Sequence, residues 1–376
     1  MTVLLEALDT PRGQALLLHY GDRKDPRLAL VDGGPRNSYD EVLRPRLEEL
    51  RHHRGGTLEV DLVVVSRAVD DHAFGIVDLT DELVLLDEED GGDTDVPYLI
   101  DDLWHNSWDD LLGPHADAML KACRGRVPAS DPHAALGRVP ELTATGADLL
   151  AHVPHGRRLR HNSGLLDLHL NQGLDLITTA AGEVELGQGL SLTVLAPTET
   201  TIDRLRESSL RATSAAEAIA LVQGPLHGAA ALVLLAEAEG RRMLLAGGAS
   251  GDVVAAALEE AGLGGVEPVR LDLVAFSPGG ADQEGRRDLA RRIVADRWLL
   301  CGDGGADPSY WVGLLETLRA SAAPPAVAVS GIPSEALAGG VREKLEAALG
   351  SALVLRREEE RSLTLQLRGT GSGGVA

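Results

Sequence analysis

Short apolar runs separated by turn residues fill the first part of the chain. Each run has the length of a strand, and Gly, Pro and Asp occupy the intervals between the runs. This pattern predicts a β-meander. Its expected strands are Val3–Leu8, Ala15–Tyr20 and Leu28–Val31. The valine-rich run Val60–Val65 (VDLVVV) predicts one more strand, of the buried kind.

A helix is expected between the meander and this buried strand. Apolar residues recur at helical spacing over 42–50, and Ser38 followed by Glu41 has the pattern of a capping box. We therefore predict a helix that begins at Ser38. The polar residues 66–72 predict a loop before a short helical segment. The acidic run 87–93 predicts a solvated loop rather than a cation site, because its carboxylates lack ligand spacing.

The second half of the chain repeats this outline. Apolar runs at 230–236 and 242–246 predict a hairpin, after which predicted helices and strands alternate. These are helices 252–261, 283–295, 309–320 and 334–349, and strands 271–276, 298–301, 326–330, 353–355 and 362–367. Two meanders, each followed by βα units, predict two facing sheets with helices outside. The expected fold is an α/β, four-layer αβ/βα sandwich.

The middle of the chain is less regular, and we interpret it as an insert. We expect a single domain over 1–368, with this insert at about 87–175 and a flexible tail at 369–376. The insert and the residues after it predict helices at 108–123 and 157–170 and strands at 174–179, 183–186 and 190–195.

Composition narrows the classes of function. Asp and Glu number 58 against 35 Lys and Arg, a net charge of −23, which predicts no nucleic-acid partner because a phosphate backbone would be repelled. We find no apolar run of membrane-spanning length and no signal peptide, and we expect a cytoplasmic protein. Cys123 and Cys301 are too few for a disulfide framework. Few residues are aromatic, so the core must be aliphatic.

Four stretches resemble the metallo-β-lactamase fold hydrolases, especially the branch related to the soluble domain of the ComEC competence protein. ALDTPRGQALLLHYG with LALVDGGP is similar to that family's DVGQGDALLL and IDGGP segments. EVDLVVVSRAVDDHAFGIVDL is similar to the strand and loop with the HxHxDH metal motif. RRMLLAGGASGDVVAAALEEAGL resembles the Gly-Asp turn and its helix, and LDLVAFSPGGADQ stands where the family has His-His-Gly-Ser.

The resemblance implies a two-metal hydrolase site, but most ligand positions hold residues that cannot bind metal. The two leading histidines of the first motif fall on Arg67 and Val69. The bridging aspartate falls on Gly248, and the final histidines fall on Pro278 and Gly279. A zinc site needs at least three His, Cys or carboxylate ligands from the protein. We therefore expect no metal at this site.

Asp71 and His72 match the motif, and His227 lies near a further ligand position. We favour a structural role, in which Asp71 caps the following helix and His72 donates to a backbone carbonyl. A metal site at these three residues and a metal-free acid/base role remain as alternatives. Asp32 would support the ligands in an active relative. Here Asp32 is expected to form an Asx-turn, and Asp9 has the same interpretation.

Three further segments carry groups that could act in binding. Trp104–Trp108 could line a groove, but we favour its packing against the sandwich. Arg157–Arg160, within a basic stretch, could hold a phosphate or an acidic peptide, but internal charge balance is the favoured interpretation. Gly302–Pro308 lacks the spacing of a phosphate-binding loop and predicts a turn.

The loss of ligands from three separate motifs leads to a functional hypothesis. We expect a catalytically degenerate scaffold, regulatory or binding component with a protein partner. The resemblance loosely suggests a multi-protein system such as bacterial defence. The alternative is a metal-dependent or metal-independent hydrolase with an atypical site around Asp71 and His72, with zinc as its cofactor if it uses one.

Overall fold

The computed structural model describes most of the chain. The described residues are 3–90, 96–113, 116–117, 154–211, 217, 228–265, 267–277, 283–302, 314, 316–318, 320, 325–330, 346–347, 350–357 and 359–367. The predicted helices at 309–320 and 334–349, much of that at 108–123 and the tail therefore lie largely or wholly outside this part. So do His227, Pro278 and Gly279.

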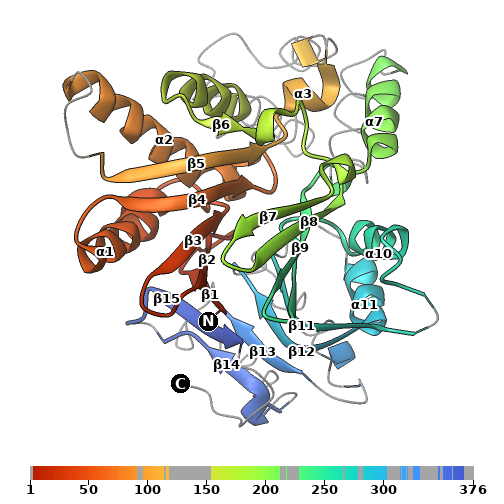
Figure 1. Cartoon of the computed structure of the whole chain (residues 1–376). Coiled ribbons are helices and arrows are strands. Elements are labelled where there is room, and N and C mark those ends of the chain that lie inside the picture. Colours follow the sequence, from red (N-terminus) through yellow and green to blue (C-terminus); the bar gives the residue numbers. More distant parts are fainter. Residues whose placement is uncertain are drawn as a thin grey trace, which may run out of the picture.

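Two sheets form the centre of the molecule (Figure 1). The first has the order β15-β1-β2-β3-β4-β5-β6 and the second β14-β13-β12-β11-β10-β9-β8-β7. The strands of the first sheet are β1 (Val3–Leu8), β2 (Leu16–Gly21), β3 (Pro26–Val31), β4 (Leu58–Val65), β5 (Tyr98–His105), β6 (His169–Leu170) and β15 (Ser362–Leu367). Those of the second are β7 (Glu183–Gly187), β8 (Leu190–Ala196), β9 (Val233–Ala238), β10 (Arg241–Leu245), β11 (Val269–Phe276), β12 (Ile293–Leu300), β13 (Ala326–Val329) and β14 (Leu353–Leu355).

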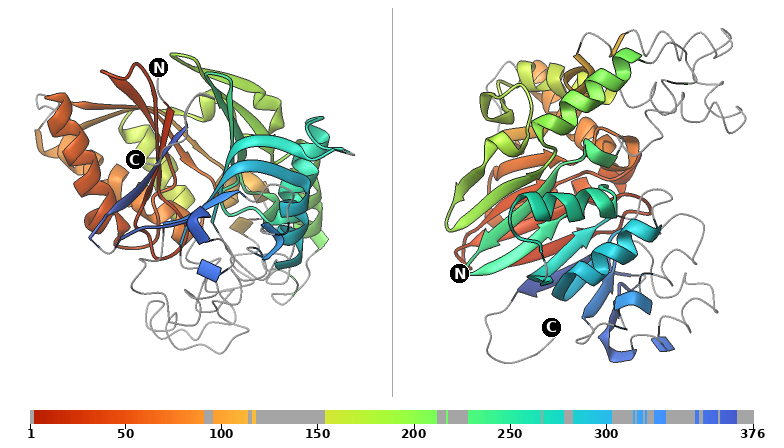
Figure 2. Two further views of the ribbon diagram at one scale, coloured as in Figure 1. Left: turned by 90° about the horizontal axis from the view of Figure 1, so that it is seen from below. Right: turned by 90° about the vertical axis from the view of Figure 1, so that its right-hand side faces the viewer.

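Helices cover the outer face of each sheet (Figure 2). On the first sheet these are α1 (Arg44–Arg54) and α2 (Asp70–Asp90), and on the second they are α10 (Gly251–Glu260) and α11 (Gln283–Arg292). The predicted four-layer αβ/βα sandwich is therefore confirmed. Within the described part of the chain, no helix is long and apolar enough to cross a membrane.

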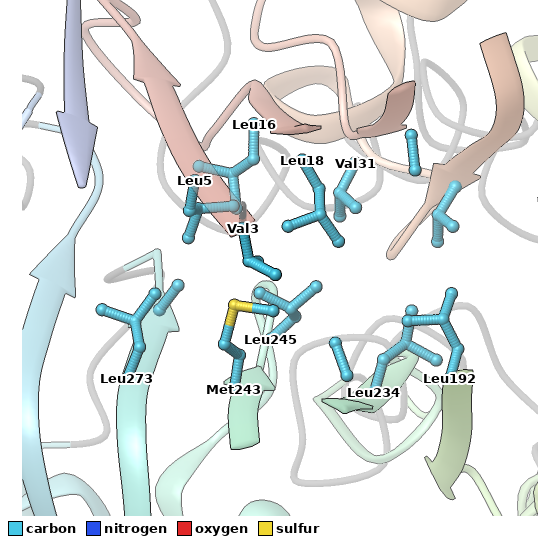
Figure 3. Close-up of a cluster of buried hydrophobic side chains, with 14 of the residues drawn as sticks. Val3, Leu5, Leu16, Leu18, Val31, Leu192, Leu234, Met243, Leu245 and Leu273 are labelled. Carbon is cyan, nitrogen blue, oxygen red and sulfur yellow. The ribbon is translucent and has the colours of Figure 1, made fainter. Parts of the chain in front are cut away.

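Aliphatic side chains fill the space between the sheets. Leu5, Leu18 and Val31 of the first sheet face Leu234 and Met243 of the second (Figure 3). Strands that lie between another sheet and a helix layer are buried on both faces, which explains their continuous apolar runs. Burying apolar surface is the main favourable contribution to folding. Because few residues are aromatic, aliphatic side chains supply most of this surface.

Several predicted boundaries are wrong. Ser38 makes no side-chain cap, and a π-helical turn at Tyr39–Leu43 leads directly into α1, so the capping box does not form. The segment after the first motif is not short, since α2 continues through the acidic residues to Asp90. The backbone at 293–295, expected to be helical, already belongs to β12, because Ile293 pairs with Val269 of β11.

The expected insert contains regular structure that the sequence pattern missed. β5 pairs in parallel with β4 along most of its length and extends the first sheet. Helix α3 (Trp108–Leu112) begins at Ser107 in a capping box with Asp110 and ends at Gly113. A helix over 154–165 ends before the predicted position, and no strand forms at 174–179. Beyond the insert, helix α7 (Glu199–Arg211) follows β8.

Candidate functional site

The candidate site lies where β3 and β4 end. These strands are parallel, so their carboxyl ends meet at one edge of the sheet. Asp32 follows β3, Ser66 follows β4, and His72 belongs to the first turn of α2. The turn at Asp32 has a φ of 61°. Asp and Asn tolerate this left-handed conformation better than most residues.

The Asp32 carboxylate is the centre of a buried hydrogen-bond cluster. It accepts hydrogen bonds from Gln14 Nε2 at 2.8 Å, from the Ser66 amide at 2.6 Å and from Ser66 Oγ at 2.6 Å. His72 Nδ1 lies 2.7 Å from Asp32 Oδ2. Asp32 and His72 are almost fully buried. Asp32 thus joins the ends of two strands to the start of α2, and the predicted Asx-turn interpretation is wrong.

Two glycines allow the helix to approach this turn closely. A Cβ atom at Gly33 would lie 2.5 Å from the Ile76 amide nitrogen, and one at Gly75 would lie 2.0 Å from the Gly33 carbonyl oxygen. Both contacts are with backbone, which a rotamer change cannot relieve. The Gly33 amide also donates to the His72 carbonyl at 2.7 Å. Glycine at both positions therefore fixes the start of α2 against the Asp32 turn.

Opposite charges face one another around His72. Burial disfavours a charged imidazole, but the carboxylates of Asp32 and Asp71 outweigh it and raise the pKa of His72 above its ordinary value. His72 Nε2 lies 4.0 Å from Asp71 Oδ1. Burial lowers the pKa of Arg67, against the opposing effect of the same two carboxylates. An arginine stays protonated in proteins, so Arg67 brings a fixed positive charge here.

Two of the expected structural roles at the motif are wrong. His72 does not use its Nδ1 to reach a backbone carbonyl, because that nitrogen faces the Asp32 carboxylate, a stronger partner. Asp71 is inside the first turn of α2 rather than at the cap position before it. In that position its carboxylate still interacts favourably with the positive end of the helix dipole.

The geometry does not fit a metal ion. Arg67 Nη1 donates to the Gly248 carbonyl at 3.0 Å. A Cβ atom at Gly248, the position of the family's bridging aspartate, would lie 2.8 Å from His72 Nε2 and 2.9 Å from Arg67 Nη1. The Arg67 guanidinium therefore lies next to the position that the Cβ atom of an aspartate at 248 would occupy. Among the described residues, no three His, Cys, Asp or Glu side chains form a group that could hold a metal.

Other candidate residues have structural partners. Asp9 accepts a hydrogen bond from Arg356 Nη2 at 2.6 Å, so it forms an ion pair with a distant part of the chain rather than an Asx-turn. Cys301 is buried, and burial raises the pKa of its thiol to about 12, which makes it an inert apolar residue at neutral pH.

The tryptophan segment packs into the fold instead of lining a surface groove. Trp104 and Trp108 are buried, and Trp104 Nε1 donates to Asp102 Oδ2 at 2.9 Å. Between them, His105 is fully buried, and neither ring nitrogen has a hydrogen-bond partner among the described residues. Burial lowers the pKa of His105 to about 4, so this histidine is neutral at neutral pH.

The basic cluster is balanced within the chain, as its favoured interpretation predicts. Its arginines contact carboxylates on α2, on α3 and just beyond α3. The ion pairs are Arg157 with Asp109 and Asp117, Arg158 with Asp81, and Arg160 with Asp110, at 2.5 to 2.8 Å. Exposed pairs of this kind contribute little stability each. They link the helix at 154–165 to α2 and α3. Each of these three arginines already has a carboxylate partner, so the cluster does not form an obvious phosphate site.

Comparison with known proteins finds similarity only among solved structures. No protein-family model matches this chain, and no curated protein does. Zn²⁺-bound PqqB from Methylobacterium extorquens is 12% identical, with alignment over 95% of this chain and 88% of that one and a TM-score of 0.40. A protein of unknown function from Enterococcus faecalis is 11% identical over 95% of this chain and 77% of that one, with a TM-score of 0.31.

A variant of the β-hydroxylase CmlA is also similar in structure. It is 12% identical, and the alignment covers 97% of this chain and 54% of that chain, with a TM-score of 0.38. This chain thus spans about half the length of the CmlA chain. Similarity at these TM-scores does not indicate a function. We therefore infer function from this chain's own residues.

Proposed function

We propose that this chain is a catalytically degenerate member of the metallo-β-lactamase fold that works without metal as a binding component for a protein partner. The observation that carries the proposal is the position of Arg67. Its guanidinium contacts Gly248 and stands beside His72 Nε2, where the resemblance places metal ligands. A fixed cation at this point opposes the binding of a divalent ion.

The departures from the family motif also fit one another. A side chain at position 248 would require Arg67 or His72 to shift, and Gly248 leaves that space to the guanidinium. The carboxylates of Asp32 and Asp71 are then balanced by Arg67 and His72 rather than by a metal. Such mutual fit supports a site rebuilt for stability, with its original chemistry lost.

The acidic surface supports a protein partner. The net charge of −23 repels nucleic acid, while the basic cluster at 157–160 is already paired within the chain. A partner would therefore meet a surface rich in carboxylates. The atypical hydrolase around Asp71 and His72 is the competing reading, and metal analysis separates the two.

The test is the metal content of the protein purified without chelators, together with its thermal unfolding when zinc, manganese or iron is added. We expect metal well below one equivalent and no saturable rise in melting temperature. A ligand that binds only the folded state must raise stability by mass action. One bound equivalent that is lost in an Asp71→Asn, His72→Gln double variant would overturn the proposal and establish the alternative site.

A further inference from the structure

A hollow lies away from the Asp32 cluster, at the side where both sheets end. It is a cavity of about 620 Å³, open to solvent, between the edge formed by β5 and β6 and the edge strand β7. Arg27 and Asp61 reach it from β3 and β4. Val184 and Leu186 line its β7 side, and both also pack against the core between the sheets. We call this cavity the edge groove.

The edge groove carries excess negative charge. Its lining includes four carboxylates and one arginine. Asp61 is compensated, since Arg27 Nε donates to it at 2.7 Å and Tyr20 donates its hydroxyl hydrogen. Asp101 and Glu185 are exposed and have no ion-pair partner in the described part of the chain. Their charges are therefore available to a cationic ligand.

Unpaired strand edges adjoin the groove, and the one on β5 meets it at Asp101. β6 has only two residues and pairs with Asp102 and Leu103 of β5. The outer edge of β5 from Tyr98 to Asp101 thus has no strand partner among the described residues, and β7 pairs only with β8. An unpaired edge presents backbone N–H and C=O groups that can accept an added strand.

Alternation along β5 specifies what such a strand would carry. Residues two apart on a strand point to the same face, so Leu99 and Asp101 lie side by side. Leu99 is 56% exposed, so its side chain is accessible to an added strand. Directly opposed side chains on paired strands interact. An apolar residue opposite Leu99 and a basic residue opposite Asp101 would complement this edge.

We propose that the edge groove binds an extended, basic segment of a partner protein, which adds as a strand to the free edge of β5. The segment carries an apolar and a basic residue two positions apart, and Asp101 and Glu185 attract its cations. This inference rests on the proposed role as a binding component and names the chemistry of the partner. It does not depend on the absence of metal.

The test uses full-length protein and fluorescent synthetic peptides. The probe peptide has serine at every second position, with leucine and lysine alternating between them. A second peptide has glutamate in place of lysine. A third keeps the lysines but has N-methyl groups on every second amide, in two versions that block either edge of the strand. We expect the lysine peptide to bind, and the glutamate peptide and at least one methylated version to bind at least about tenfold more weakly, because they lose charge attraction or backbone pairing.

Protein variants locate the site. Asp101→Lys and Glu185→Lys should each weaken binding of the lysine peptide severalfold, and together at least about tenfold. Glu260→Lys, at the exposed end of α10, changes the net charge equally and should leave affinity unchanged. Absence of binding, equal weakening by Glu260→Lys, or full binding by both methylated peptides would overturn the inference. None of these results bears on the metal measurement, so the two proposals fail separately.

Discussion

The Asp32 cluster and the edge groove use carboxylates in opposite ways. Asp32 is buried and accepts four hydrogen bonds or close contacts from Gln14, Ser66 and His72. Asp101 and Glu185 are exposed and have no basic partner within the described chain. A buried charge must be compensated inside the protein, whereas an exposed charge is solvated and free to meet a partner. A carboxylate with partners inside the protein therefore stabilises this fold, whereas an exposed carboxylate without them can bind another molecule.

Asp32→Asn should have the largest effect on stability, because it removes the buried negative charge at the centre of the cluster. Asparagine keeps the size of the side chain and tolerates the φ of 61° at this position. It removes the charge that faces His72 and Arg67, which we expect to cost about 3–5 kcal/mol of unfolding free energy, as for other broken buried pairs. Urea unfolding measures the loss. Asp203→Asn, at an exposed position of α7, is the control, and a similarly small effect at both positions would contradict the assignment.

The sequence predicted the sandwich but only part of this cluster. The runs at Val3–Leu8 and Val60–Val65 are strongly apolar, so their strands could be predicted from local pattern. Asp71 and His72 were found through the motif. The contact of His72 with Asp32 was not, because it joins residues forty positions apart and depends on how the two strand ends align. The role of Arg67 was equally hidden, since it becomes clear only beside Gly248.

β5 was missed for a related reason. Its first half alternates buried and exposed residues with acidic side chains at Asp101 and Asp102, which reduces its apolar signal. It is nevertheless a strand because it pairs with β4, an interaction that lies outside any local window. The residues that weaken its pattern are the same ones that line the edge groove. Sequence pattern is thus least informative where the chain departs from an ordinary buried strand.

His105 is a buried titratable group whose ring nitrogens, unlike the Asp32 carboxylate, have no hydrogen-bond partner among the described residues. Its pKa of about 4 in the folded protein is below the ordinary value of 6.5, so the unfolded chain takes up a proton first as pH falls. Its contribution to stability is complete above pH 6.5 and is lost as pH falls towards 4. At 1.36 kcal/mol per pKa unit, the loss is about 3 kcal/mol.

A pair of variants isolates this effect. His105→Leu removes the titrating group and the two unpartnered ring nitrogens, so its unfolding free energy should fall about 2–3 kcal/mol less than that of the wild type between neutral pH and about pH 4.5. Urea unfolding at both pH values gives the difference. His161→Leu, at an exposed position, is the control for replacing a histidine with leucine. Parallel pH profiles for wild type and His105→Leu would show that burial does not hold His105 neutral.

Gly75→Ala tests the packing that brings α2 to the Asp32 turn. Its Cβ atom would lie 2.0 Å from the Gly33 carbonyl oxygen, so the helix must shift, which should cost about 1–3 kcal/mol. Gly164→Ala is also a helical substitution, but nothing lies within 4 Å of the new Cβ atom. It should stabilise the protein by about 0.5–1 kcal/mol. Thermal unfolding distinguishes these opposite signs, and stabilisation by both would refute the close contact.

The smallest effect on stability is expected in the edge groove, and its small size completes the comparison. Asp101→Asn and Glu185→Gln remove exposed charges that have no ion-pair partner in the described chain, so each should change the unfolding free energy by less than about 0.5 kcal/mol. Both should nevertheless reduce the salt dependence of lysine-peptide binding, because fewer charges then attract the peptide. Unfolding and binding are measured on the same samples. A large stability loss would assign these carboxylates to the fold, as Asp32 is assigned, and would remove the distinction between the two regions.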